Sequence, residues 1–350
     1  MLTRRDLNRT LLRRQHLLER TSMPALAMVE HLVGLQAQDN LPPYLSLAAR
    51  LTDFDPADLS GAIERREAVR LLAMRGTIHV LTPDDALALR PWVQAGLDQQ
   101  SNANQNSRPA RDVPVRDLEE AVRRLLADGP LPVRTLGERL AEVFPDVPAA
   151  ALAHKARERV ALVQVPPRGL WGASGGVVHQ TVETWLGRPS TTVDVRDLVR
   201  RYLRAFGPAT ASDMTTWSRV TRLGPVFASM ADELVPVACE DGRTRYDVEG
   251  APYAEGDEPA PVRLLGCYDN LWLSHADRSH VVDDAARRRW AGPNGGVAHT
   301  VFVDGFMAGL WRRREGRVDV VELFRRLTRA ERADLDAEVA RTETFLAHPA

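Results

Sequence analysis

The chain has 350 residues, enough for two or three domains of ordinary size. Its 44% hydrophobic and 27% charged residues are typical of a soluble globular protein and exclude wholesale disorder, collagen and a coiled-coil rod. Two cysteines, Cys239 and Cys267, are too few for a disulfide framework. We see neither a secretory signal nor an apolar run near the roughly 18 to 20 residues of a membrane span. We therefore expect a cytoplasmic protein that contacts no membrane.

The net charge is ordinary, but the choice of basic residues is unusual. The net charge is −1, so composition alone does not indicate a nucleic-acid partner. Lys155 is the only lysine, and arginine carries the remaining positive charge. A GC-rich genome explains this bias. Its chemical consequence is that bidentate phosphate contacts are available, whereas amine chemistry is nearly excluded.

The first unit predicted along the chain combines helices with a strand pair. Apolar spacing and helix-starting prolines predict a helix over 4–20 and three more before two short strands at 69–73 and 77–81. A helix then leads towards Gly96. Helices followed by a strand pair are the element order of a winged helix.

Two further units repeat this order. Each has helices followed by a predicted hairpin, the second with Asp241-Gly242 at its turn. The predicted class is mainly α with short β hairpins (α+β), as tandem winged-helix domains with a small β-barrel-like cap. The predicted boundaries are winged helix 1 at 1–97, a polar linker at 98–115, winged helix 2 at 116–190, winged helix 3 at 191–250, and a β-rich cap with a terminal helix at 251–350.

Familiar catalytic motifs are missing from the sequence. No histidine or cysteine pair has a metal-ligand spacing, and His275 and His280 are five residues apart. There is no G-x-S-x-G elbow and no phosphate-binding glycine loop followed by lysine. We expect no metal and no organic cofactor.

A Gln-x-Gln pattern stands between a predicted helix end at Gly34 and Pro42-Pro43. In an extended segment, Gln36 and Gln38 would point the same way, because side chains alternate along the backbone. Two neutral amides could then hold one water molecule with both donors and acceptors. The alternative is that they only cap a helix end or line a loop.

Six segments, in order, resemble the AlkZ-like DNA glycosylases, which excise bulky alkylated guanines and unhook crosslinks. The resemblance covers nearly the whole chain. It rests on LQAQD at 35–39, LAMRGTIHVL at 72–81, PPRGLWG at 166–172, FGPATASDM at 206–214, GCYDNLWLSHADR at 266–278 and TVFVDGFMAGLW at 300–311.

This resemblance implies several winged helices in a C-shape with a small barrel, and a catalytic Gln–apolar–Gln motif. Gln36, Ala37 and Gln38 match that motif, whereas a sister branch has Asp in place of the second Gln. Guanine alkylated at N7 is already cationic and leaves as a neutral base, so positioning and dipoles can replace much acid catalysis. We assign water positioning to Gln38 and orientation of that water or of the sugar to Gln36. Asp39 is a candidate base or electrostatic partner, or else a loop cap.

Lysine scarcity bears on the reaction type. A glycosylase-lyase needs an amine nucleophile to form a Schiff base, and only Lys155 and the α-amine of Met1 offer one. We therefore expect a monofunctional hydrolase that leaves an intact abasic site.

DNA contacts are expected from arginines near the predicted site and at the N-terminus. Trp171 could wedge into a groove, or it could simply be buried. Residues 232–258 hold nine acidic residues against two arginines, so that wing is a poor phosphate binder. The candidate DNA-binding residues are Arg4, Arg5, Arg75, Arg168 and Trp171.

A polar run in the cap supplies secondary candidates. These residues could line the cleft, or they could form an internal hydrogen-bond network. They are Asp269, Asn270, His275, Asp277 and Arg278.

The predicted function is hydrolysis of the N-glycosidic bond of N7-alkylated guanine, bulky or crosslinked, in double-stranded DNA. The enzyme would be a nucleoid-associated monomer that gives self-resistance to a DNA-alkylating natural product. One alternative is a non-catalytic winged-helix DNA-binding protein or regulator. The other is an unrelated hydrolase that uses Asp39 or an Asp277–His275 pair.

Overall fold

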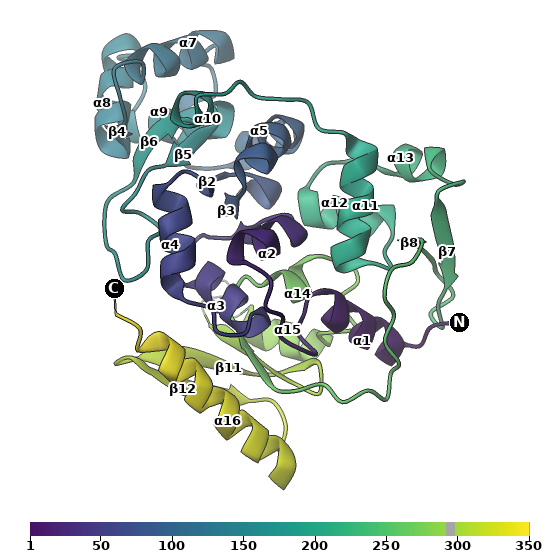
Figure 1. Ribbon diagram of the computed structural model, residues 1–350. Helices are drawn as coiled ribbons and strands as arrows, with labels where there is room; N and C mark the ends of the chain where they lie inside the picture. The colour runs from purple at the N-terminus through teal and green to yellow at the C-terminus, as the bar shows by residue number, and fades with distance from the viewer. Residues whose placement is uncertain (292–297, 350) are drawn as a thin grey trace.

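The structure is a computed structural model that describes residues 1–291 and 298–349 (Figure 1). Within these ranges the strands form a six-stranded, a four-stranded and a two-stranded sheet. The two termini lie on opposite sides of the molecule, the N-terminus beside β7 and the C-terminus near α4. Every helix in the described ranges is too short or too polar to span a lipid bilayer.

The N-terminal segment packs helices around three strands of the six-stranded sheet. Helix starts follow from sequence: Asp55 accepts a hydrogen bond from Ala57 N, and Pro56 occupies the first turn of α4. The elements are α1 (Arg4–Arg14), α2 (Ala25–His31), β1 (Leu35–Gln36), α3 (Leu41–Arg50), α4 (Pro56–Glu64), β2 (Val69–Leu72), η1 (Met74–Gly76), β3 (Ile78–Leu81), α5 (Pro83–Trp92) and α6 (Gln94–Ala103).

The next segment has a hydrophobic core of its own, with Leu118, Leu136 and Leu152 fully buried. Its strands complete the six-stranded sheet, in the order β1-β3-β2-β5-β6-β4. The elements are η2 (Arg108–Ala110), α7 (Val115–Leu125), β4 (Leu131–Pro132), α8 (Val133–Val143), α9 (Ala149–Arg159), β5 (Leu162–Gln164), β6 (Val178–Thr181) and α10 (Val182–Leu186). Figure 1 shows α7, α8 and α9 together at one corner of the molecule.

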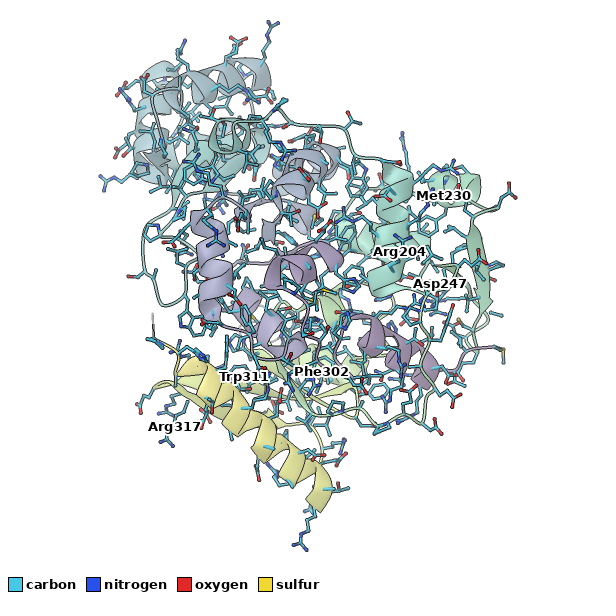
Figure 2. The ribbon with its side chains drawn as sticks, in the orientation of Figure 1. Arg204, Met230, Asp247, Phe302, Trp311 and Arg317 are labelled. Atoms are coloured by element: carbon cyan, nitrogen blue, oxygen red, sulfur yellow. The ribbon has the colours of Figure 1, made fainter. Side chains whose placement is uncertain are left out.

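The third segment is a helical group with a hairpin. Asp247 of this hairpin, labelled in Figure 2, forms a buried ion pair with Arg14 of α1 at 2.7 Å and so ties the two segments together. The elements are α11 (Val195–Phe206), α12 (Ala211–Ser218), α13 (Gly224–Ser229), β7 (Leu234–Ala238) and β8 (Thr244–Val248).

The C-terminal segment is a four-stranded antiparallel sheet in the order β12-β11-β10-β9, with α16 lying against it. This sheet buries Phe302 and Trp311, both labelled in Figure 2. The elements are β9 (Arg263–Leu265), α14 (Asn270–Leu273), α15 (Asp284–Trp290), β10 (His299–Val303), β11 (Phe306–Arg314), β12 (Arg317–Leu323) and α16 (Arg329–Leu346).

Sequence predictions and structure differ in three places. The helix expected over 4–20 ends at Arg14. The expected barrel-like cap is wrong for the described residues, because β9 and β12 are opposite edges of an open sheet. The run at 98–115, expected to be a linker, contains the second half of α6 and the short η2. The strand pair at 69–73 and 77–81 is confirmed within one residue, and the predicted hairpins and the terminal helix are present.

Candidate active site

The Gln36–Gln38 segment lies along one edge of the six-stranded sheet. Gln36 is paired with His79 of β3, and Ala37 N donates to Ile78 O at 2.7 Å. The chain is therefore extended through Ala37, whereas Gln38 begins a bend at 38–40 that leads into α3 at Leu41.

Both glutamine amides have a fixed orientation. Arg75 Nη2 donates to Gln36 Oε1 at 3.0 Å, and Ile78 N donates to Gln38 Oε1 at 3.0 Å. An arginine nitrogen and a backbone N–H are donors only, so each carbonyl oxygen must face its partner. The amide nitrogens then point elsewhere. Gln36 is buried, whereas Gln38 is exposed.

Arg75 is a structural partner of Gln36. It lies in η1 with a left-handed backbone, φ 57°. Its Nη1 donates to Trp217 O at 2.8 Å, and its Nη2 lies 3.1 Å from His79 Nε2. Burial, together with the smaller effects of the Arg278 and Arg219 charges, lowers the pKa of Arg75 to about 9. The phosphate contact predicted for Arg75 thus competes with its bond to Gln36.

The neutral form of His79 accepts a hydrogen bond from Arg75. Its Nδ1 donates to Thr77 O at 3.0 Å, which leaves Nε2 as the acceptor. Burial lowers the pKa of His79 to about 3, and the Arg75 charge adds to this effect. The imidazole therefore stays uncharged at neutral pH.

Arg70 is a functional candidate that sequence reasoning missed. This side chain is 1% exposed, and its Nη2 donates to Ala37 O at 2.9 Å, between the two glutamines. Burial lowers its pKa to about 10, with a smaller contribution from the nearby charge of Arg168. A charged residue inside the apolar strand Val69–Leu72 was the available signal.

The segment at 166–172 covers Arg70. Gly169 has φ +94°, and a Cβ on it would lie 2.2 Å from Arg70 Cδ, so only glycine fits there. Arg168 of the same loop is half-buried and close enough to Arg70 for their charges to interact.

Asp39 is exposed at the end of the Gln motif. Burial raises the pKa of the Cys267 thiol to about 12, and the negative charge of Asp39 contributes to the increase. The Asp39 carboxylate therefore lies near Cys267, between the Gln segment and the C-terminal sheet.

A cavity of about 340 Å³ begins at Asn40, next to Asp39. It is also lined by Tyr44, Trp171 and Arg313. The Trp171 ring packs 5.1 Å from both Tyr44 and Phe345, and its Nε1 donates to His348 O. These contacts fix the orientation of the indole, and Trp171 is half-buried at the wall of the cavity.

The secondary candidates separate into buried and surface groups. Asp269 forms a buried ion pair with Arg50 at 2.7 Å. Asn270 Nδ2 donates to Gly34 O at 2.8 Å and so anchors the entry to β1. These two residues form the internal network that the sequence left open as an alternative.

The other three candidates do not form a catalytic pair. His275 is buried and its Nε2 lies 2.9 Å from Phe206 O. Asp277 pairs with Arg243 at 3.1 Å instead. Arg278 is half-buried over the Trp272 ring, at 5.7 Å, with its charge near Arg75.

Arg4 and Arg5 lie away from the glutamines. Arg5 pairs with Asp304 at 2.9 Å, and Arg4 lies over the Phe306 ring. Both line a cavity beside the C-terminal sheet.

A basic hairpin was also missed. The turn between β11 and β12 presents four exposed arginines, and Figure 2 shows Arg317 at its outer end. Arg313 also lines the cavity at Asn40. The set is Arg312, Arg313, Arg314 and Arg317.

Comparisons with known proteins identify the family of this chain. Residues 29–345 match the family profile described as "DNA glycosylase AlkZ-like". The chain belongs to the AlkZ-like family and is a DNA glycosylase, as the six motifs imply.

One relative and one solved structure define the likeness further. The chain is 25% identical over 320 residues to the "Interstrand DNA cross-link repair glycosylase" of Streptomyces sahachiroi, covering 86% of this chain and 85% of the relative. The solved "Streptomyces sahachiroi DNA glycosylase AlkZ" has a TM-score of 0.81 at 22% identity, covering 99% and 98% of the two chains. The fold is therefore shared over the whole length.

Proposed function

We propose that this enzyme hydrolyses the N-glycosidic bond of N7-alkylated guanine in duplex DNA. The observation that carries the proposal is the pair of glutamines whose amides are fixed by donor-only partners at one sheet edge. The relative's name supports a bulky or crosslinked adduct as substrate.

The reaction needs little acid catalysis. The C1′–N9 bond breaks, and its electron pair neutralises the cationic base, so no proton has to be donated to the leaving group. The enzyme has to place water against C1′ and stabilise the charge that develops on the sugar.

The two glutamines have different parts in this step. Gln38 is exposed, and its Oε1 has a second lone pair beyond the one used by Ile78 N. That lone pair accepts a bond from the attacking water. The Nε2 of Gln36 donates to this water or to the sugar. Asp39 receives the proton that the water loses and passes it to solvent.

Lys155 supports a hydrolase without lyase activity. Its Nζ donates to Ala110 O at 2.6 Å and Arg111 O at 2.9 Å, in the α7–α9 segment. The residue is 4% exposed and both bonds hold its amine, so it is not placed to attack a sugar.

The β11–β12 arginines and Arg168 supply phosphate contacts, because they form no ion pair with a carboxylate among the described residues. The helix-then-hairpin segments act as winged helices around the duplex. The protein acts as a nucleoid-associated monomer in self-resistance to a DNA-alkylating compound.

The test is single-turnover excision from a duplex that carries an N7-alkylguanine. Wild type should leave an alkali-labile abasic site with no adduct trapped by borohydride. Gln38→Ala should slow excision at least 100-fold, or about 2.7 kcal/mol. Gln105→Ala, at an exposed glutamine away from the site, is the matched control.

If wild type binds DNA but excises no adduct, the catalytic proposal is wrong. The non-catalytic DNA-binding alternative would then replace it. Equal rates for wild type and Gln38→Ala would instead remove the glutamine mechanism.

A further inference from the structure

The surface beside Arg75 carries arginines that lack carboxylate partners. Many arginines elsewhere are neutralised, for example Arg200, which pairs with Glu233 at 2.6 Å. Arg219 and Arg278, in contrast, form no ion pair within the described residues. Both lie close enough to Arg75 for their charges to repel it. Such a cluster favours a negatively charged ligand.

A cavity of about 330 Å³ lies at this place, between α6 and α12. Arg219, which follows the last residue of α12, is its only charged lining residue. The others are uncharged hydrogen-bonding side chains and Gly96, and the cavity wall contains no carboxylate among the described residues. The polar lining residues are Gln99, Gln100, Thr215, Thr216 and Thr221.

Arg75 links this cavity to the Gln36–Gln38 segment. Gln100 Nε2 donates to Arg75 O at 3.3 Å, and Arg75 Nη1 donates to Trp217 O of α12. In addition, Arg75 Nη2 donates to Gln36 Oε1. Arg75 therefore contacts the cavity residue Gln100 through its backbone and Gln36 through its side chain.

We propose that this cavity binds a backbone phosphate of the DNA strand next to the alkylated nucleotide. Arg219 forms the charged contact, and the hydroxyl and amide groups of α6 and α12 complete the donor set, which is the chemistry that phosphodiesters select. The inference rests on the proposed function, because it places the phosphate relative to Gln36. The site fixes the register of the strand, so that the target C1′ reaches the glutamines.

Binding to unmodified duplex DNA tests the site without using catalysis. Arg219→Gln should weaken affinity on the order of tenfold at low salt and reduce the slope of log K against log salt by about 0.9. Arg200→Gln removes the same charge from a paired position and should change neither quantity. Thr221→Asp places a carboxylate at an exposed position of the cavity rim and should weaken binding further.

A duplex with single methylphosphonate substitutions locates the contact. Wild type should lose affinity at one phosphate beside the lesion, and Arg219→Gln should be insensitive to substitution at that same phosphate. An unchanged salt slope in both Arg219→Gln and Thr221→Asp overturns the inference. Excision by wild type is measured separately, so failure of this site and failure of the glycosylase proposal are distinguishable.

Discussion

Arg70 and Arg75 hold the Gln36–Gln38 segment from two ends of one strand pair. Arg75 bonds to the first amide and Arg70 to the carbonyl of Ala37. Neither guanidinium pairs with a carboxylate among the described residues, so each is a buried charge compensated mainly by carbonyl oxygens. In the proposed mechanism Arg75 acts on the reaction through Gln36 and is a positioning residue.

Replacing Arg75 should separate rate from affinity. Arg75→Gln removes the guanidinium that donates to Gln36 Oε1, so the Gln36 amide can rotate and excision should slow by about 10- to 100-fold, or roughly 1.4 to 2.7 kcal/mol. The Kd for duplex DNA should change less than threefold. Single-turnover rates and equilibrium binding measure the two effects, and Arg75→Lys should recover part of the rate.

The opposite pattern would support the contact predicted from sequence. If Arg75→Gln weakens DNA binding and leaves the excision rate at saturation unchanged, Arg75 binds phosphate directly. A melting temperature within a few degrees of wild type confirms that the variant is folded.

The residues that sequence could predict are those with a local pattern. Gln36 and Gln38 are two positions apart at the end of a short extended segment, and that spacing is visible in the chain itself. The role of Asp269 depends on Arg50, which lies 219 positions earlier. Arg70 and Asn270 likewise contact segments distant in sequence, and no local pattern identifies such partners.

At the scale of elements, the six-stranded sheet joins two separate cores. β2 meets β5 through the pair Leu71 and Val163, and beyond this junction α7, α8 and α9 pack on their own core. The Gln36–Gln38 segment begins at the opposite end of the sheet, on β1. We therefore expect the α7–α9 segment to open without disturbing the glutamines.

Leu152→Ala tests this independence. The side chain is fully buried in α9, and its truncation should cost about 2 to 5 kcal/mol of local stability. Hydrogen exchange should speed up in α7, α8 and α9 and stay unchanged at Ala37 and Ile78. Val143→Ala, at a 43% exposed position on α8, is the control. Faster exchange across the whole sheet would show one cooperative unit instead.

Hairpins and helix ends were predictable because each depends on a few neighbouring residues. The Asp241-Gly242 turn sits where expected, with Gly242 at φ +75°. Whether the C-terminal sheet closes into a barrel was not predictable. It would require β9 to pair with β12, and no turn or alternation pattern in either strand specifies such a partner.

At the scale of the whole molecule, buried neutral histidines set the response to acid. Burial is the main cause that lowers the pKa of His79 and His280 to about 3 and that of His179 and His299 to about 4. In the unfolded chain each would take up a proton near pH 6.5. The unfolded state therefore binds more protons as the pH falls below 6.5.

The free energy of unfolding should thus fall as the pH is lowered from 6.5 to about 4. The stabilisation from the buried neutral histidines is fully present above pH 6.5. Each histidine adds up to about 1.4 kcal/mol per pH unit to the slope. Urea unfolding at pH 7.5, 6.5, 5.5 and 4.5 measures the effect. His299→Gln should make the slope shallower. A free energy of unfolding that is constant from pH 7.5 to 4.5 would contradict the expectation.

The order of strands in the six-stranded sheet has a consequence during synthesis. β1, β2 and β3 leave the ribosome early, but the outer edge of β2 pairs only with β5, near residue 163. At a translation rate of about 5 to 20 residues per second, that edge stays unpaired for on the order of several seconds until β5 is synthesised. An unpaired edge of apolar residues such as Leu71 and Leu72 is a template for association with other nascent chains. Folding in the cell is therefore most vulnerable to aggregation while the α7–α9 segment is being translated.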